Sequence, residues 1–170
     1  MHALYPGSFD PFTTGHLDIV ERGLKIFPEI TIVVAESAIK NALFTTEERV
    51  ELIRKVLKDG GALFKDKGKR VQVASWGGLT MDYARKHNAV AVVRGLRAAS
   101  DFEYEFMMAS MNRKIDAKIE TVFIMSSSDL YFVSSTMIKE LYLVGGDVKP
   151  YVPPAVFDAL KRKKPVGAKK

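Results

Sequence analysis

The sequence has no cysteine and a single tryptophan, and none of its apolar runs approaches the length needed to cross a membrane. Without cysteine there are no disulfides and no thiolate nucleophile, which is typical of proteins in a reducing compartment. The N-terminus also lacks the basic and then apolar layout of a signal peptide. We therefore expect a cytoplasmic protein with no membrane partner.

The sequence also has fewer acidic than basic residues: 20 Asp and Glu and 26 Lys and Arg give a formal net charge of +6. Six of these basic residues and none of the acidic ones lie in the last ten positions, 161–170. The remainder is neutral overall. We expect one domain over residues 1–160, followed by a flexible basic tail over 161–170. A nucleic-acid-binding module would have to use that tail, and the neutral body disfavours such a partner.

Apolar runs of strand length alternate with segments of helical periodicity along the whole chain. Strands are predicted over residues 2–5, 30–35, 71–75, 89–93 and 119–125. Helices are predicted over 17–27 (stopped by Pro28), 45–57, 79–87, 101–114 and 133–143, with a last one starting at Pro153-Pro154. This order predicts an α/β fold, a single-domain Rossmann-like parallel five-stranded sheet with helices on both faces. In such sheets, ligands bind at the carboxyl ends of the strands.

The stretch "YPGSFDPFTTGH" follows the first predicted strand. Thr13 and Thr14 are candidate N-caps, and Gly15 and His16 fall in the first helical turn. Free N–H groups and the helix dipole make such a turn an anion site, to which His16 can add a hydrogen bond. Helix capping alone is an equally good explanation of His16, so both interpretations remain open here.

The segment "RGLR" is predicted to lie directly beyond the buried strand 89–93. Arg94 and Arg97 can therefore present guanidinium groups to phosphate oxygens. The alternative is a pair of surface arginines that meet the acidic residues of "DFEYE", and the fixed position of Arg94 favours a functional role. Glu105 is explained as well by a salt bridge as by ligand contact.

Three hydroxyl residues in succession, Ser134, Ser135 and Thr136, stand at another predicted helix start. Capping accounts for one hydroxyl, and the other two suggest a second phosphate cradle. Lys40 lies in a short loop after strand 30–35, where a lysine usually faces solvent.

Together these segments carry a family resemblance. "TTGH" matches the T/H-x-G-H signature of the nucleotidyltransferase superfamily, and "YPGSFDPFTTGH" resembles the bacterial phosphopantetheine adenylyltransferases in particular. The resemblance continues through "FTTEERVEL" at 44–52, "VVRGLRAASDFEYEFMMASMNR" at 92–113, "FVSSTMIKE" at 132–140 and "GGDV" at 145–148. Blocks in this order and at these separations are far more specific than the short signature alone.

The resemblance implies an enzyme of coenzyme A biosynthesis that transfers the adenylyl group of ATP to 4′-phosphopantetheine. The expected products are dephospho-coenzyme A and pyrophosphate, formed reversibly by direct in-line attack. Mg²⁺ is expected to arrive with ATP, with no metal ligand from the protein. The resemblance also implies a homohexamer built from two trimers, and it makes coenzyme A a candidate feedback inhibitor.

The resemblance also implies roles for individual residues. Catalysis is expected to depend on His16, Lys40 and Arg94. The expected ATP contacts are Ser8, Phe9, His16, Gly95, Leu96, Arg97, Glu105, Leu130, Tyr131, Phe132, Val133, Ser134, Ser135 and Thr136. The expected contacts of the acceptor are Ser8, Lys40, Thr80 and Arg94. The chain departs from the family pattern at Asn41, where many members carry a second lysine, and at Leu130 and Tyr131.

Two other functions use the same residues. Nicotinamide mononucleotide could be the acceptor, or glycerol phosphate with CTP as donor, but the blocks at 92–113 and 145–148 resemble the phosphopantetheine enzymes instead. A catalytically silent nucleotide sensor is disfavoured because His16, Lys40 and Arg94 are all present.

Overall fold

Five parallel strands form the centre of the protein in a computed structural model, which describes residues 1–36, 42–60, 70–97 and 99–163. The strands are β1 (His2–Gly7), β2 (Glu29–Ala35), β3 (Val71–Trp76), β4 (Ala91–Leu96) and β5 (Glu120–Met125), in the order β3-β2-β1-β4-β5. The order reverses between β1 and β4, so their carboxyl ends flank the place where such a sheet binds ligands. The predicted parallel five-stranded sheet is confirmed.

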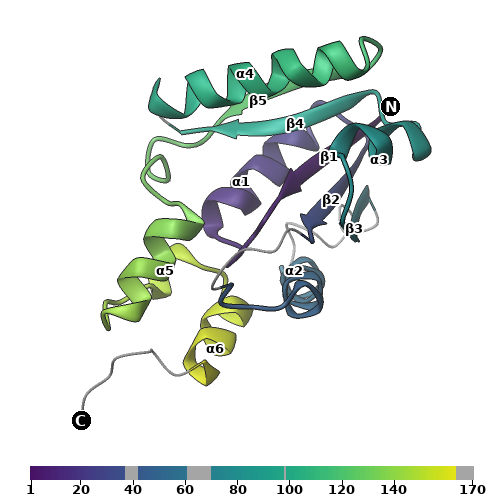
Figure 1. Cartoon of the computed structure of the whole chain (residues 1–170). Helices are drawn as coiled ribbons and strands as arrows, with labels where there is room; N and C mark the ends of the chain where they lie inside the picture. The colour runs from purple at the N-terminus through teal and green to yellow at the C-terminus, as the bar shows by residue number, and fades with distance from the viewer. Residues whose placement is uncertain (37–41, 61–69, 98, 164–170) are drawn as a thin grey trace.

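Helices cover both faces of this sheet (Figure 1). They are α1 (Thr14–Gly23), α2 (Thr46–Asp59), α3 (Thr80–Lys86), α4 (Ala99–Ile115), α5 (Ser135–Leu143) and α6 (Pro154–Arg162), with a short 3₁₀ turn, η3 (Lys149–Tyr151). The helices α1 and α2 pack on one face and α3 and α4 on the other, while α5 and α6 lie beyond the carboxyl ends of the strands. None of the described helices is both long and apolar enough to span a membrane.

Side chains of the central strands alternate between two apolar clusters. Leu4 and Val92 pack with the residues of α3, whereas Ala3, Tyr5 and Val93 belong to the larger cluster under α1, α2, α5 and α6. All five are nearly fully buried. Burial on both faces explains why the strands read as continuous apolar runs rather than as alternating patterns.

Local sequence explains where the helices begin. Thr45 caps α2, because its hydroxyl accepts from the Glu48 N–H and its own N–H donates to the Glu48 carboxylate, as the Thr45–Glu48 spacing predicts. Ser134 caps α5 through the Met137 N–H. The last helix begins at Pro154, as predicted.

Several boundaries differ from the prediction, and three of them are informative. The first helix ends at Gly23, well before Pro28. Gly23 also lies so close to Ile30 that a Cβ there would be 2.7 Å from its Cδ1. Strand β4 runs on to Leu96, so "RGL" belongs to the strand rather than to a loop beyond it. The boundary predicted between 160 and 161 falls inside α6, and Lys163 still bonds Glu48 at 2.8 Å.

Candidate active site

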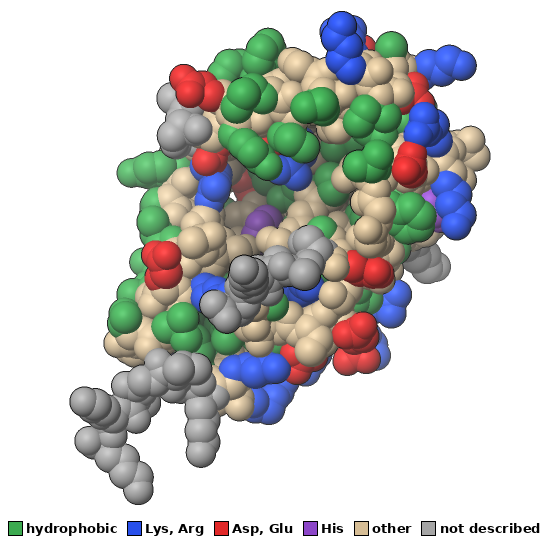
Figure 2. All heavy atoms as spheres, viewed as in Figure 1, with side chains coloured by type: hydrophobic (Ala, Val, Ile, Leu, Met, Phe, Trp, Pro, Cys, Tyr) green, Lys and Arg blue, Asp and Glu red, His purple; other side chains and the backbone are tan. Residues whose placement is uncertain are grey.

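Two cavities adjoin each other at the carboxyl edge of the sheet. The α1-side cavity, of about 250 Å³, is lined by Tyr5, Phe9, Gly15, His16, Ile19, Gly95, Arg97, Ser126 and Val133–Thr136. The α4-side cavity, of about 290 Å³, is lined by Ala35, Thr80, Val92, Tyr104, Met108, Ala109, Asn112 and Thr121. Pro6, Gly7, Ser8, Arg94 and Glu105 line both. Figure 2 shows the hollow on this face, with a histidine side chain and basic side chains inside it.

His16 stands on the first turn of α1 and is oriented by its own helix cap. The Thr13 N–H donates to its Nδ1 at 3.0 Å, while the His16 N–H donates to the Thr13 hydroxyl at 3.3 Å. Because Nδ1 accepts this bond, the proton of the neutral ring is on Nε2, which is left to donate into the cavity. Capping and a functional role, which the sequence left as alternatives, are therefore compatible in this geometry.

The environment of His16 keeps its ring neutral. Phe9 and Phe12 pack on the imidazole with centroids 5.1 and 5.5 Å away. Burial, together with the positive charges of Arg97 and Arg94, lowers the pKa of His16 to about 3. At neutral pH the ring is therefore a hydrogen-bond donor without a net charge.

Two helix N-termini meet at the α1-side cavity. Gly15 belongs to the first turn of α1, and Ser135 and Thr136 to the first turn of α5, where backbone N–H groups lack acceptors within the helix. Both dipoles direct partial positive charge into the same space. Gly15 lies close to the start of α5, since a Cβ there would be 3.5 Å from the Val133 carbonyl oxygen. This arrangement suits a polyphosphate.

The three hydroxyls of the predicted cradle have different surroundings. The Ser134 hydroxyl caps α5, and the Ser135 hydroxyl donates to the Pro11 carbonyl at 2.8 Å. Only the Thr136 hydroxyl has no partner among the described residues, and it lines the cavity. The cradle therefore consists mainly of backbone N–H groups, rather than of three side-chain hydroxyls.

Arg94 lies on β4 between the two cavities. Its guanidinium donates to both carboxylate oxygens of Glu105, at 2.7 Å from Nε and 2.5 Å from Nη2, and to the Pro6 carbonyl at 2.8 Å. Of the five N–H groups of an arginine, two are left without an acceptor within the described chain. Glu105 is thus the salt-bridge partner of Arg94, and it also lines both cavities. Arg97 pairs with Asp101 at 3.0 Å and still lines the α1-side cavity.

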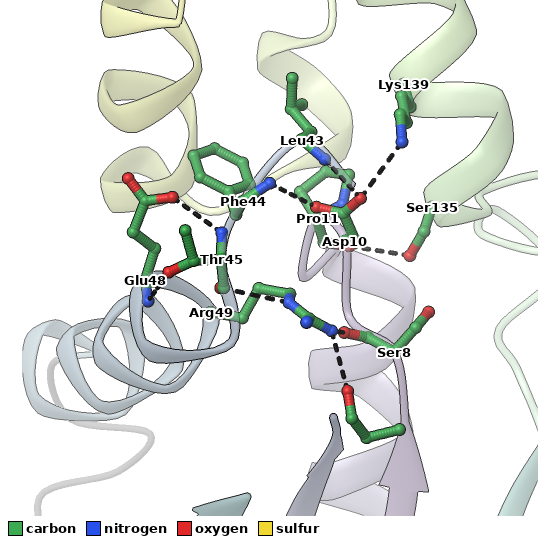
Figure 3. Close-up of polar contacts among 11 residues, drawn as sticks. Ser8, Asp10, Pro11, Leu43, Phe44, Thr45, Glu48, Arg49, Ser135 and Lys139 are labelled. Carbon is green, nitrogen blue, oxygen red and sulfur yellow. Dashed lines mark hydrogen bonds and ion pairs between the residues drawn. The ribbon is translucent and has the colours of Figure 1, made fainter. Parts of the chain in front are cut away.

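The loop between β1 and α1 is held by the start of α2 (Figure 3). Arg49, which is buried, donates to the Ser8 carbonyl at 2.6 Å, to the Ala35 carbonyl at 3.2 Å and to the Thr45 carbonyl at 3.2 Å. One guanidinium therefore joins the Ser8 loop, the end of β2 and the start of α2. Since Ser8 lines both cavities, Arg49 determines the position of a residue at their junction.

Asp10 holds the same loop from the other end (Figure 3). Its buried carboxylate accepts from the N–H groups of Leu43 and Phe44 at 2.8 and 2.9 Å, and Lys139 of α5 lies 3.3 Å from it. These bonds tie α5 and the approach to α2 to the loop that carries Ser8 and Phe9. Asp10 and Arg49 were not among the predicted site residues, although both lie in the quoted blocks "YPGSFDPFTTGH" and "FTTEERVEL".

Four of the predicted ATP contacts do not line either cavity. Leu96 is buried, Leu130 packs against the larger apolar cluster, and Tyr131 and Phe132 are 58% and 39% exposed. The last three belong to the turns between Ser127 and Val133, where the Leu130 N–H donates to the Ser127 carbonyl and the Val133 N–H to the Leu130 carbonyl. Thr80 lines the α4-side cavity, whereas Lys40 and Asn41 lie outside the described residues.

Comparisons with known proteins agree with this geometry. The model of the cytidylyltransferase-like family matches residues 4–141. A phosphopantetheine adenylyltransferase of Geotalea daltonii is 49% identical over 95% of both chains, and one of Geobacter metallireducens is 48% identical over 95% of this chain and 94% of that one. The chain belongs to the phosphopantetheine adenylyltransferase family.

A solved structure of another adenylyltransferase shares only the fold with this chain. The nicotinic acid mononucleotide adenylyltransferase of Plasmodium falciparum, complexed with NaAD, has a TM-score of 0.68 at 16% identity and covers 95% of this chain and 94% of its own. The predicted nucleotidyltransferase fold is thus confirmed, whereas the phosphopantetheine adenylyltransferases named above are also similar in sequence.

Proposed function

We propose that this chain transfers the adenylyl group of ATP to 4′-phosphopantetheine, releasing pyrophosphate and dephospho-coenzyme A. The observation that carries the proposal is the α1-side cavity, where two helix N-termini and the imidazole of His16 converge beside a second cavity. The family relationship supplies the identity of the acceptor.

The reaction makes one bond and breaks one bond at the α-phosphorus of ATP. A phosphate oxygen of the acceptor attacks that phosphorus, and the bond to the bridging oxygen of pyrophosphate breaks on the opposite side. No proton has to be abstracted from an ionised phosphate. The chain therefore has to align the reactants and stabilise the added charge on the α-phosphoryl oxygens.

His16 and the two helix starts carry this charge stabilisation. The Nε2–H of His16 donates to an α-phosphoryl oxygen, and backbone N–H groups of Gly15, Ser135 and Thr136 bind the phosphates that leave. Because the imidazole is neutral, it donates without having to lose a proton during the transfer. Lys40 remains a candidate for the reacting phosphate by family resemblance.

Arg94 binds the phosphate of the acceptor. Glu105 and the Pro6 carbonyl hold its guanidinium in place, and its two remaining N–H groups can bind a phosphate at the junction of the cavities. The pantetheine arm then extends along the α4-side cavity past Thr80 and Met108. This places the attacking oxygen on the α4 side and pyrophosphate on the α1 side.

Mg²⁺ is proposed to enter with ATP, where it neutralises phosphate charge. Among the described residues no group of three or more His, Cys, Asp or Glu side chains could hold a metal, and Glu105, the carboxylate that lines both cavities, is bonded to Arg94.

The test is pyrophosphate release across pairs of donor and acceptor. We expect turnover with ATP and 4′-phosphopantetheine, and at least about a hundredfold less with CTP and glycerol phosphate or with ATP and nicotinamide mononucleotide. Comparable rates with another acceptor would contradict the assignment. Coenzyme A added to the same assay tests whether it inhibits.

We also propose that α4 joins copies of this chain into the hexamer that the family resemblance implies. Seven large apolar side chains of this one helix are exposed: Phe102, Tyr104, Phe106, Met107, Met108, Met111 and Ile115. They form much of the green area along α4 at the top of Figure 2. These side chains are therefore not packed in the core of the described chain. Exposed apolar surface of this extent is typical of protein interfaces.

Sedimentation equilibrium tests the assembly. The wild type is expected at six times the monomer mass, and Met111→Lys at a lower mass, since a charge would be buried at the interface. Glu103→Lys on the same helix is the control for added positive charge. A monomeric wild type would contradict the proposal.

A further inference from the structure

The hydroxyl of Tyr5 is a polar group in the α1-side cavity that the proposed function does not use. Tyr5 lies near the carboxyl end of β1, is 5% exposed and lines this cavity. Its hydroxyl forms no hydrogen bond with any described residue. The buried Tyr142, by contrast, donates to the carbonyls of Leu160 and Lys163. Among the described residues no buried side-chain nitrogen or oxygen lacks a partner, so this unbonded hydroxyl is accessible from the cavity, where a ligand oxygen can accept its hydrogen bond.

The surroundings leave room for that ligand beside the hydroxyl. The ring of Tyr5 is held by an edge-on contact with Phe9, centroid to centroid 5.4 Å, and by His16 at 6.4 Å. On the neighbouring strand stands Gly95, where a Cβ would lie 3.9 Å from the hydroxyl and 3.0 Å from Ile19. The absence of a side chain at Gly95 therefore lets Ile19 of α1 pack closely against this strand and leaves the hydroxyl without a neighbouring side chain from that position.

The charges around Tyr5 favour an anionic acceptor. Burial raises the pKa of Tyr5 well above its usual range, so the hydroxyl stays protonated and can donate. Arg94 and Arg97 are near enough to act on it electrostatically, with Glu105 and Asp18 as the opposing charges. Both of these carboxylates are bonded to other residues, Glu105 to Arg94 and Asp18 to Arg22 and Ser127.

We propose that the Tyr5 hydroxyl donates a hydrogen bond to an oxygen of the bound nucleoside triphosphate. This rests on the proposed function. The nucleotide is the partner rather than the acceptor because Tyr5 lines the α1-side cavity and is absent from the lining of the α4-side cavity. Tyr5 also shares its face of the sheet with Gly95 and α1, whereas Arg94 is directed towards Glu105 of α4.

Equilibrium binding to the Tyr5→Phe variant tests this assignment. The substitution removes one oxygen and keeps the ring contacts with Phe9 and His16. We expect the Kd for ATP to rise about tenfold or more, as for the loss of a hydrogen bond to a charged group. The Kd for the acceptor, phosphopantetheine, is expected to stay within about twofold of the wild-type value. Calorimetric titration of the full chain measures both constants.

Tyr83→Phe is the matched control. Tyr83 is also buried, packs on Trp76 and His87 on the opposite face, and lies outside both cavities. Removing the hydroxyl of Tyr83 is expected to leave the Kd for ATP and the Kd for phosphopantetheine unchanged. An unchanged Kd for ATP in Tyr5→Phe overturns the proposal, and so does an equal loss of affinity for both substrates, which would indicate a role in packing.

The two proposals fail in different ways. If the wild type binds neither ATP nor phosphopantetheine, the proposed function fails and the role of Tyr5 fails with it. If the wild type turns over and Tyr5→Phe binds ATP as tightly as the wild type, only the role of Tyr5 is wrong.

Discussion

The two cavities share one sheet edge but differ in what forms their walls. The α1-side cavity is built from the ends of two helices, so that backbone N–H groups, His16 and Arg97 face it. The α4-side cavity is built against the side of a helix, so that Tyr104, Met108 and Asn112 face it. A helix end offers N–H groups and a helix side offers side chains. This difference separates a place for phosphates from a place for a longer and less charged arm.

The Arg94–Glu105 pair forms the boundary between the cavities. Both residues of this ion pair line the two cavities. Arg94 comes from β4 and Glu105 from α4. An acceptor phosphate bound there would lie next to the polyphosphate site. The comparison between the cavities therefore predicts that substitutions on each side affect different substrates.

The largest expected effect comes from His16→Ala. Removing a preorganised donor to the reacting phosphate is expected to lower kcat by about 10²- to 10³-fold, while ATP still binds to the helix ends. Pyrophosphate release measures kcat, and titration with ATP measures the Kd for ATP. His87→Ala, which removes a histidine stacked on Tyr83, is the control. Near-normal turnover of His16→Ala would show that the imidazole does not act on the reaction.

Arg94→Lys is expected to have the next largest effect, and mainly on the acceptor. Lysine keeps the charge but not the planar fork, so it cannot bond Glu105, Pro6 and a phosphate together. We expect the KM for phosphopantetheine to rise about 10- to 100-fold, with the Kd for ATP changed less than about threefold. Arg113→Lys, in an exposed pair with Glu120, is the control. Equal losses for both substrates would remove the distinction between the cavities.

Arg49→Lys is expected to affect both cavities together, since Ser8 lies at their junction. A lysine cannot reach three carbonyls from separate segments, so Ser8 shifts, and kcat is expected to fall about tenfold with small changes in either KM. Arg54→Lys is the control, because Arg54 donates from the same helix to the Val73 carbonyl, far from Ser8. The thermal stability of both variants is measured as well, and kcat is calculated from the concentration of ATP-binding sites. If both variants lose the same stability and keep the wild-type kcat, Arg49 stabilises the fold and does not position Ser8 for the reaction.

The smallest expected change is in the protonation of His16. Because its pKa is lowered to about 3, the ring is expected to stay neutral as the pH falls from 8 to 5, with the proton on Nε2. Ring ¹⁵N chemical shifts of the free protein measure both the charge and the tautomer. A titration of this ring near pH 6.5 would show that burial and the two arginines do not govern its pKa, and a proton on Nδ1 would contradict the hydrogen bond from Thr13.

Features that depend on neighbours in the chain could be predicted well. The caps of Thr13 and Thr45 use residues three positions apart, and the place of His16 on the first turn follows from them. The strands were predicted from apolar runs, although β4 was made too short because Arg94 and Gly95 look unlike a buried strand. In the structure Arg94 is tolerated there because Glu105 and the Pro6 carbonyl bond its guanidinium.

Features that depend on distant contacts could not be predicted in the same way. The bonds from Asp10 to Leu43 and Phe44, and from Arg49 to Ser8, join segments more than 30 residues apart. The Ser135 hydroxyl looked like a phosphate ligand and instead reaches Pro11, 124 residues away. The exposure of Phe102 and Phe106 could not be predicted either, since the periodicity of α4 does not show which of its faces meets the sheet.

The sequence by itself determined the succession of strands and helices along the chain, the helix caps and the family signature, because these depend on periodicity and on residues within one turn of each other. Only the tertiary structure decided that Arg94 pairs with Glu105, that Arg49 holds Ser8, and that Tyr5 lines the α1-side cavity beside Gly95. The physical reason is that the spatial order of the strands in the sheet brings remote chain segments together at its carboxyl edge. The distances between these segments do not follow from the spacing of residues along the chain.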